Sequence, residues 1–67
     1  MKVIIQITDN KGKIAFFRNM VGKNAVGLVG RSDAKQFLVA NWDVIKNHVL
    51  ALSTFDWIAE VSVVITF

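Results

Sequence analysis

A run of residues with helical spacing, 33–52, constrains this chain more than any other feature, because its apolar surface is too broad for one neighbour. On a helical wheel of about 100° per residue, the polar side chains share a narrow sector and the apolar ones cover roughly 200°. One covering sheet needs an apolar stripe of only about 100°. We therefore predict a helix over Asp33–Leu52 that needs cover on more than one side, from a partner or from a second copy. The apolar arc holds Ala34, Phe37, Leu38, Ala40, Trp42, Val44, Ile45, Val49, Ala51 and Leu52, and the polar sector holds Lys35, Gln36, Asp43, Lys46 and Asn47.

The length and composition of the chain limit how it can be stabilised. It has 67 residues, no cysteine and one histidine, and 54% of its residues are hydrophobic. A domain of this size buries only about 60% of its unfolded surface. Disulfides and cysteine-based zinc sites are excluded, and one histidine cannot anchor a typical transition-metal site. We predict a single domain over residues 1–67, stabilised by packing and self-association, with no metal and no cofactor.

The sequence contains no apolar run that approaches the 18 or so residues of a membrane span. The first residues carry one lysine and only a few apolar residues before Thr8, which does not resemble a secretory signal. We expect a cytoplasmic protein that does not contact a membrane.

The N-terminal third predicts a β-hairpin. Val3–Thr8 and Lys13–Arg18 are rich in β-branched and aromatic residues, and Asp9-Asn10-Lys11-Gly12 joins them. Gly12 suits the left-handed position of such a turn, which places Thr8 opposite Ile14. One face then carries Val3, Ile5, Ile7, Ala15 and Phe17, which we assign to the core. The other carries Lys2, Ile4, Gln6, Thr8, Ile14, Phe16 and Arg18, a mixed set that we expect to meet water or a partner.

Two further strands and a helix complete the predicted order β-β-β-α-β. Ala25–Gly30 is a short strand weakened by two glycines, and Phe55–Phe67 is a clear strand. Its alternation assigns to the core Trp57, Ala59, Val61, Val63, Ile65 and Phe67. Ser32 or Asp33 would cap the helix, with Gln36 completing a capping box. We predict an α+β fold, a small two-layer sandwich in which an antiparallel sheet of three to four strands carries one helix on one face.

Two polar residues lie within the apolar arc of the predicted helix. His48 follows Asn41 by seven residues, so both lie along the same stripe. A buried polar atom without a partner costs about 1–3 kcal/mol. We predict a buried polar pair, satisfied by backbone or water, or alternatively a polar contact across a dimer interface.

Catalytic chemistry has no support in the sequence. The five carboxylates fall in a turn, a helix cap, a helix face and the last strand, without a paired arrangement, and one histidine has no supporting signature. We expect neither an enzyme nor a small-molecule substrate.

We predict instead a non-catalytic protein–protein interaction module, an adaptor or inhibitor that forms a homodimer, binds a protein target, or both. Short cysteine-free chains of this kind are common in phages and mobile elements. Tryptophan is favoured at interface hot spots. The predicted contact residues are Val39, Trp42 and Leu50 on the helix, or Ile4, Ile14 and Phe16 on the mixed hairpin face.

A nucleic-acid-binding surface is the alternative. Residues 1–31 carry six basic side chains and one acidic one, a charge of +5, whereas residues 32–67 carry two basic and four acidic ones, a charge of −2. Basic and aromatic residues on an exposed sheet face are typical of single-strand binding. The residues concerned are Lys2, Lys11, Lys13, Phe16, Arg18 and Lys23.

Overall fold

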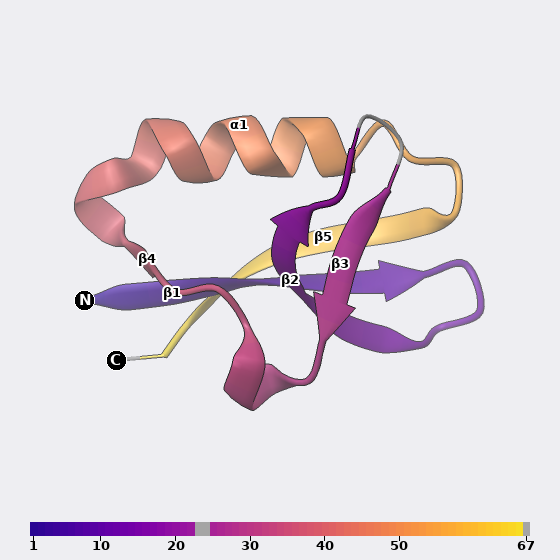
Figure 1. The fold of residues 1–67 in the computed structure, drawn as a ribbon, viewed down its shortest axis with the longest axis horizontal. Helices are drawn as coiled ribbons and strands as arrows, with labels where there is room; N and C mark the ends of the chain where they lie inside the picture. The colour runs from indigo at the N-terminus through magenta and orange to yellow at the C-terminus, as the bar shows by residue number, and fades with distance from the viewer. Residues whose placement is uncertain (23–24, 67) are drawn as a thin grey trace.

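The first strand, β1 (Lys2–Asp9), is the centre of an antiparallel sheet and has partners along both edges (Figure 1). The structure, a computed structural model, describes residues 1–22 and 25–66. Strand β2 (Ile14–Met20) pairs with residues 6–8 of β1, and the two-residue strand β4 (Phe37–Leu38) pairs with residues 2 and 3. Strand β5 (Ile58–Ile65) pairs with β1 over residues 3–9. The expected α+β fold and the order β-β-β-α-β are confirmed, with β4 as a short additional strand.

The hairpin between β1 and β2 has the predicted turn and register. Thr8 lies opposite Ile14, and the amide of Asp9 donates to the carbonyl of Lys13 at 3.0 Å. Gly12 has φ of +83°, the left-handed conformation that glycine adopts without a steric cost. Local turn chemistry was therefore sufficient to determine this pairing.

Strand β3 (Val26–Val29) is the outer neighbour of β2, and a register shift between Phe17 and Asn19 disturbs their ladder. Such a bulge bends the strand and increases its twist. In Figure 1 the β2–β3 pair turns up from β1 in front of β5, and helix α1 (Trp42–Leu52) lies across the open side of this curled sheet.

Apolar side chains gather on both faces of β1. The larger cluster lies under the helix and contains Val3, Ile5, Ile7, Phe17, Phe37, Ile45 and Leu52. The smaller one lies on the opposite face and contains Ile4, Phe16 and Ala34, with Val29 and Val64 packed against it. The expectation that the mixed hairpin face meets water or a partner is therefore wrong for Ile4 and Phe16, because the chain itself covers them.

The predicted helix over residues 33–52 is wrong in its first half. The helix begins at Trp42, and the preceding residues form a 3-10 turn (Arg31–Asp33), β4 and a second 3-10 turn (Val39–Asn41). The amide of Lys35 donates to the carbonyl of Phe17 at 3.0 Å, which holds this segment beside β2. Ala34 then covers one face of the sheet and Phe37 enters the core on the other. Tertiary contacts thus override helix propensity here, and the segment supplies cover that a helix on one face would not.

The shorter helix has a narrower buried stripe than expected. Ile45 and Leu52 are fully buried, and Val49 packs against the same cluster. The predicted capping box with Ser32, Asp33 and Gln36 is absent, because the residue that precedes the helix is Asn41, which makes no side-chain cap. The helix ends without a glycine as expected, where the hydroxyls of Ser53 and Thr54 donate to helix carbonyls at 2.7 Å.

Strand β5 is shorter than the predicted strand and only part of its core face is covered. Val61 and Val63 pack against the larger cluster as expected. Trp57 and Ile65 remain 40% and 61% exposed, and Ala59 is exposed as well, which corrects the assignment of these three residues to the core. A register shift opposite Thr8 and Asp9 also turns Ile58 toward that cluster. Phe67 lies outside the described residues.

Two glycines allow the turn assignment to be tested. Replacing Gly12 by alanine should lower the free energy of unfolding by about 1–2 kcal/mol, because a β-carbon disfavours the left-handed conformation. Gly30 has φ of −72° and ψ of 167°, and no atom lies within 4 Å of the position that a β-carbon would take there. Gly30→Ala should therefore be neutral or stabilising by up to about 1 kcal/mol. Urea denaturation of both variants provides the comparison, and equal effects would contradict the turn assignment.

Candidate functional site

An exposed apolar surface forms where the N-terminus, β4 and the start of the helix meet. The amide of Val39 donates to the carbonyl of Met1 at 3.2 Å, and Leu38 is paired with Lys2. Trp42 follows Val39 by one turn. The side chains of Met1, Leu38, Val39 and Trp42 are 72%, 51%, 39% and 52% exposed. We call these four residues the Trp42 surface.

Of the three helix contact residues predicted from sequence, two lie close together and the third does not. Val39 and Trp42 both belong to the Trp42 surface. Leu50 is 57% exposed, but it lies eight residues beyond Trp42, or about 12 Å along the helix axis. Sequence reasoning missed Met1, because only the pairing of β4 with β1 brings the N-terminus to the start of the helix. It placed Leu38 on the apolar arc of a longer helix and not in the contact surface.

The three hairpin contact residues predicted from sequence do not share an exposed surface. Ile14 is 55% exposed, whereas Ile4 and Phe16 are 1% and 9% exposed. The guanidinium carbon of Arg31 lies 5.9 Å from the centre of the Phe16 ring, which adds a cation–π contact over that ring. Ile4 and Phe16 therefore stabilise the monomer and offer no surface to a partner.

The predicted buried polar pair does not form. Asn41 is exposed in the second 3-10 turn. His48 is half-buried, and its ring lies 5.0 Å from that of Phe17 and 5.4 Å from that of Phe37. The two residues separate because the helix begins only after Asn41, so they no longer share a helical stripe. His48 instead acts as an aromatic packing residue between helix and sheet.

The predicted nucleic-acid surface has basic residues but no exposed Phe16 ring beside them. Phe16 is buried, so its ring offers no face for a base to stack on. Arg18 donates to the carbonyl of Asp33 at 3.2 Å and thereby helps to hold the wrapping segment. Lys2, Lys11 and Lys13 are exposed, and Lys23 lies outside the described residues.

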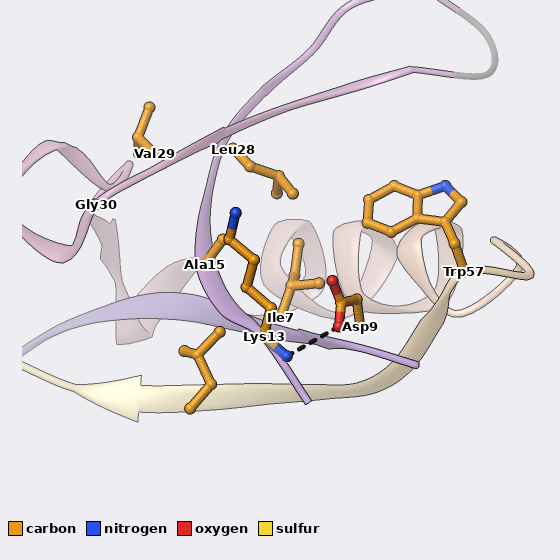
Figure 2. Close-up of a pocket in the computed structure, with 9 residues that line it drawn as sticks. Ile7, Asp9, Lys13, Ala15, Leu28, Val29, Gly30 and Trp57 are labelled. Atoms are coloured by element: carbon orange, nitrogen blue, oxygen red, sulfur yellow. Dashed lines mark hydrogen bonds between the residues drawn. The ribbon is translucent and has the colours of Figure 1, made fainter. Parts of the chain in front are cut away.

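An open cleft of about 460 Å³ lies between the start of β5 and the β2–β3 pair (Figure 2). Trp57 stands on one side with the indole nitrogen turned away, and Leu28 and Val29 stand on the other. Ile7, Asp9, Lys13, Ile14, Ala15 and Gly30 complete the lining. The sequence contains no local signal for this cleft, because its walls come from three strands, β1, β2 and β3, and from Trp57, which lies just before β5.

The carboxylate of Asp9 in this cleft is engaged in holding the hairpin turn. Its Oδ1 accepts hydrogen bonds from the backbone amides of Lys11 and Lys13, both at 2.9 Å (Figure 2 draws the second). Bonds of this kind, in which a side chain satisfies nearby amides, stabilise turns. Asp9 therefore has a structural role in the cleft, whose remaining lining is largely apolar.

The described residues contain neither a candidate metal cluster nor a membrane-spanning helix. Within residues 1–22 and 25–66, no three histidine or acidic side chains come together as a metal centre requires. No helix in the same residues is long and apolar enough to cross a membrane. Comparison with family models, with curated proteins and with solved structures finds no match for this chain.

The structural role of Asp9 leads to a measurable expectation. Asp9→Ala should lower the free energy of unfolding by about 1 kcal/mol, because two turn amides lose their acceptor. Asp9→Asn retains an oxygen acceptor and should lose less. Asp56→Ala, which removes an exposed carboxylate next to Trp57 in the sequence, should change stability by less than about 0.5 kcal/mol. If Asp9→Ala is as mild as Asp56→Ala in urea denaturation, the turn does not depend on Asp9.

Proposed function

We propose that this protein is a non-catalytic protein-binding module, an adaptor or inhibitor that also self-associates, and that the Trp42 surface contacts its protein target. The single observation that carries the proposal is that four large apolar side chains on neighbouring backbone segments, those of Met1, Leu38, Val39 and Trp42, remain exposed. Exposed apolar groups scattered singly are ordinary, but several in one region of the surface are typical of an interaction site.

The position of Trp42 supports its role as the anchor of this surface. Tryptophan contributes a large rigid area at little conformational cost and is enriched among interface hot spots. Backbone pairing of β4 with β1 holds Leu38 and Val39 in place beside it. A partner would therefore bind a largely preorganised surface, which lowers the entropic cost of association.

The proposal needs no catalytic group and no bound ion. A phage or mobile-element origin and a cytoplasmic location accord with a short, cysteine-free interaction module, and both belong to this proposal.

The Trp42 surface is tested by comparing two equally exposed positions on one helix. Trp42 and Val44 are 52% and 48% exposed and point about 160° apart around the helix axis. Each serine variant should retain the fold, because neither side chain belongs to the buried core. In quantitative affinity capture from host cells, Trp42→Ser should lose the specific target at least tenfold relative to the wild-type chain, and Val44→Ser should retain it.

A third variant defines the extent of the surface. Loss of the same target with Leu50→Ser would include Leu50 in the contact, and retention would restrict the contact to the start of the helix. If a folded Trp42→Ser chain captures the same proteins in the same amounts as Val44→Ser, the Trp42 surface is not the binding site.

A further inference from the structure

Strand β5 is fully paired along one edge and contains no buried residue. All its residues are half-buried or exposed, whereas its neighbour β1 buries four side chains over the same length. Val61 and Val63 pack against the larger cluster and still remain half-buried. The difference between the two strands is that β1 has neighbours on both edges, whereas β5 pairs only with β1 among the described strands.

The hydrogen-bond pattern identifies which backbone groups of β5 face outward. The amide of Thr66 donates to the carbonyl of Lys2 at 2.9 Å, and this pair belongs to the same register that places Val64 opposite Ile4. In an antiparallel ladder, hydrogen-bonded and non-hydrogen-bonded pairs alternate. The even-numbered residues from Glu60 to Val64 therefore bond to β1, and the amides and carbonyls of Val61, Val63 and Ile65 point away from it.

The other free edge of the sheet is much less suited to pairing. Strand β3 has only four residues, includes Gly27 and follows a bulged ladder. Short length and bulges are among the devices that protect sheet edges from association. In β5 the register with β1 is constant from residue 60 to residue 66, and Glu60 is the only charged residue there.

We propose that the open edge of β5 pairs antiparallel with β5 of a second copy of this chain, around a two-fold axis beside Val63. Val63 is the midpoint of the regular segment 60–66. In this register Val63 lies opposite its own copy and Val61 lies opposite Ile65, which gives six backbone hydrogen bonds. Ile65, 61% exposed in the monomer, gains an apolar neighbour. The two-fold axis is perpendicular to the sheet, so both helices lie on the same face of the joined sheet.

Charge does not oppose this pairing. Each Glu60 lies opposite Thr66 of the other copy, and the two Glu60 side chains are about 20 Å apart along the strands. That separation is about two and a half times the screening length of about 8 Å at physiological salt. Residues 54–67 contain no lysine or arginine, and Lys2 of β1 lies opposite Thr66 along the edge of β5 that is already paired.

The expected interface is small. Interfaces contain about one hydrogen bond per 100–200 Å², so six bonds correspond to roughly 600–1,200 Å². This is below the usual area of about 1,600 Å² for a stable complex. We therefore expect a dimer with a micromolar dissociation constant. The inference rests on the self-association included in the proposed function and names its surface, which is distinct from the Trp42 surface.

Two double variants that differ in one charge test the register. Glu60→Lys/Thr66→Lys places like charges opposite each other twice in the dimer, whereas Glu60→Lys/Thr66→Glu places opposite charges there. Both lose the same two side-chain hydrogen bonds, from Ser62 to Glu60 and from Thr66 to Lys2. Residue 66 also lies opposite Lys2 of the same chain, so urea denaturation of each variant has to show a folded monomer at the concentrations used. Sedimentation equilibrium from micromolar to millimolar concentration should show the first dimerising at least about tenfold more weakly than the second.

Amide hydrogen exchange of the wild-type chain, followed by NMR, locates the interface without any substitution. Amides of Val61, Val63 and Ile65 should exchange quickly in dilute solution and become protected as the dimer fills. Amides of Ser62 and Val64 should be protected at every concentration, because they bond to β1.

Three outcomes would overturn the inference: a wild-type chain that stays monomeric at millimolar concentration, a dimer whose two charge variants associate equally, or outward amides whose exchange ignores concentration. None of these outcomes affects target capture through Trp42. Conversely, loss of the target with Trp42→Ser should leave the dimerisation constant unchanged, so the two proposals fail separately.

Discussion

Strand β1 is hydrogen-bonded along both edges and covered on both faces, and the rest of the molecule is arranged to meet these two demands. Its residues alternate between two apolar clusters, with Ile5 under the helix and Ile4 on the opposite face. A two-layer fold with one helix satisfies only one of these faces. Residues 1–22 and 25–66 contain a single α-helix, so the other face is covered by irregular backbone.

The segment between β3 and the helix resolves this conflict. It runs as two short 3-10 turns around a two-residue strand, holds on to β2 through the amide of Lys35, and places Ala34 and Phe37 on opposite faces of the sheet. The same strand, β4, fills the edge of β1 that β2 leaves free when it bends away. The sheet's curl and the shortened helix are thus consequences of one requirement.

This arrangement leaves some apolar side chains and one edge of the sheet uncovered. Leu38 and Trp42 remain exposed, and β5 has no second neighbour among the described strands, so that its outer edge is free. These two features lie in different places and offer different chemistry. The first is a patch of side chains suited to a partner of complementary shape, and the second is a row of backbone groups suited to another strand.

The elements that were predicted correctly are those whose structure is determined by residues close to them in the sequence. The hairpin was predictable because Asp9 and Gly12 determine the turn within four residues, and the alternation of the strands then assigns Ile5 and Phe17 to one face. The end of the helix was predictable for the same reason, since Ser53 and Thr54 act on carbonyls within one turn. The exposure of Trp42 and Leu50 also follows from their place on the wheel.

The sequence could not determine the conformation of residues whose contacts are with segments far away in the chain. Residues 34–38 have helical spacing, but they do not form a helix. In their observed conformation they pair with the open edge of β1 and cover the apolar side chains of Ile4 and Phe16. That change also separated Asn41 from His48 and brought Met1 beside the start of the helix. The sequence by itself therefore determined the turns, the strand faces and the order of elements, which depend on neighbouring residues. Only the tertiary structure decided the start of the helix and the composition of each surface, because those depend on burial energies summed over contacts far apart in the chain.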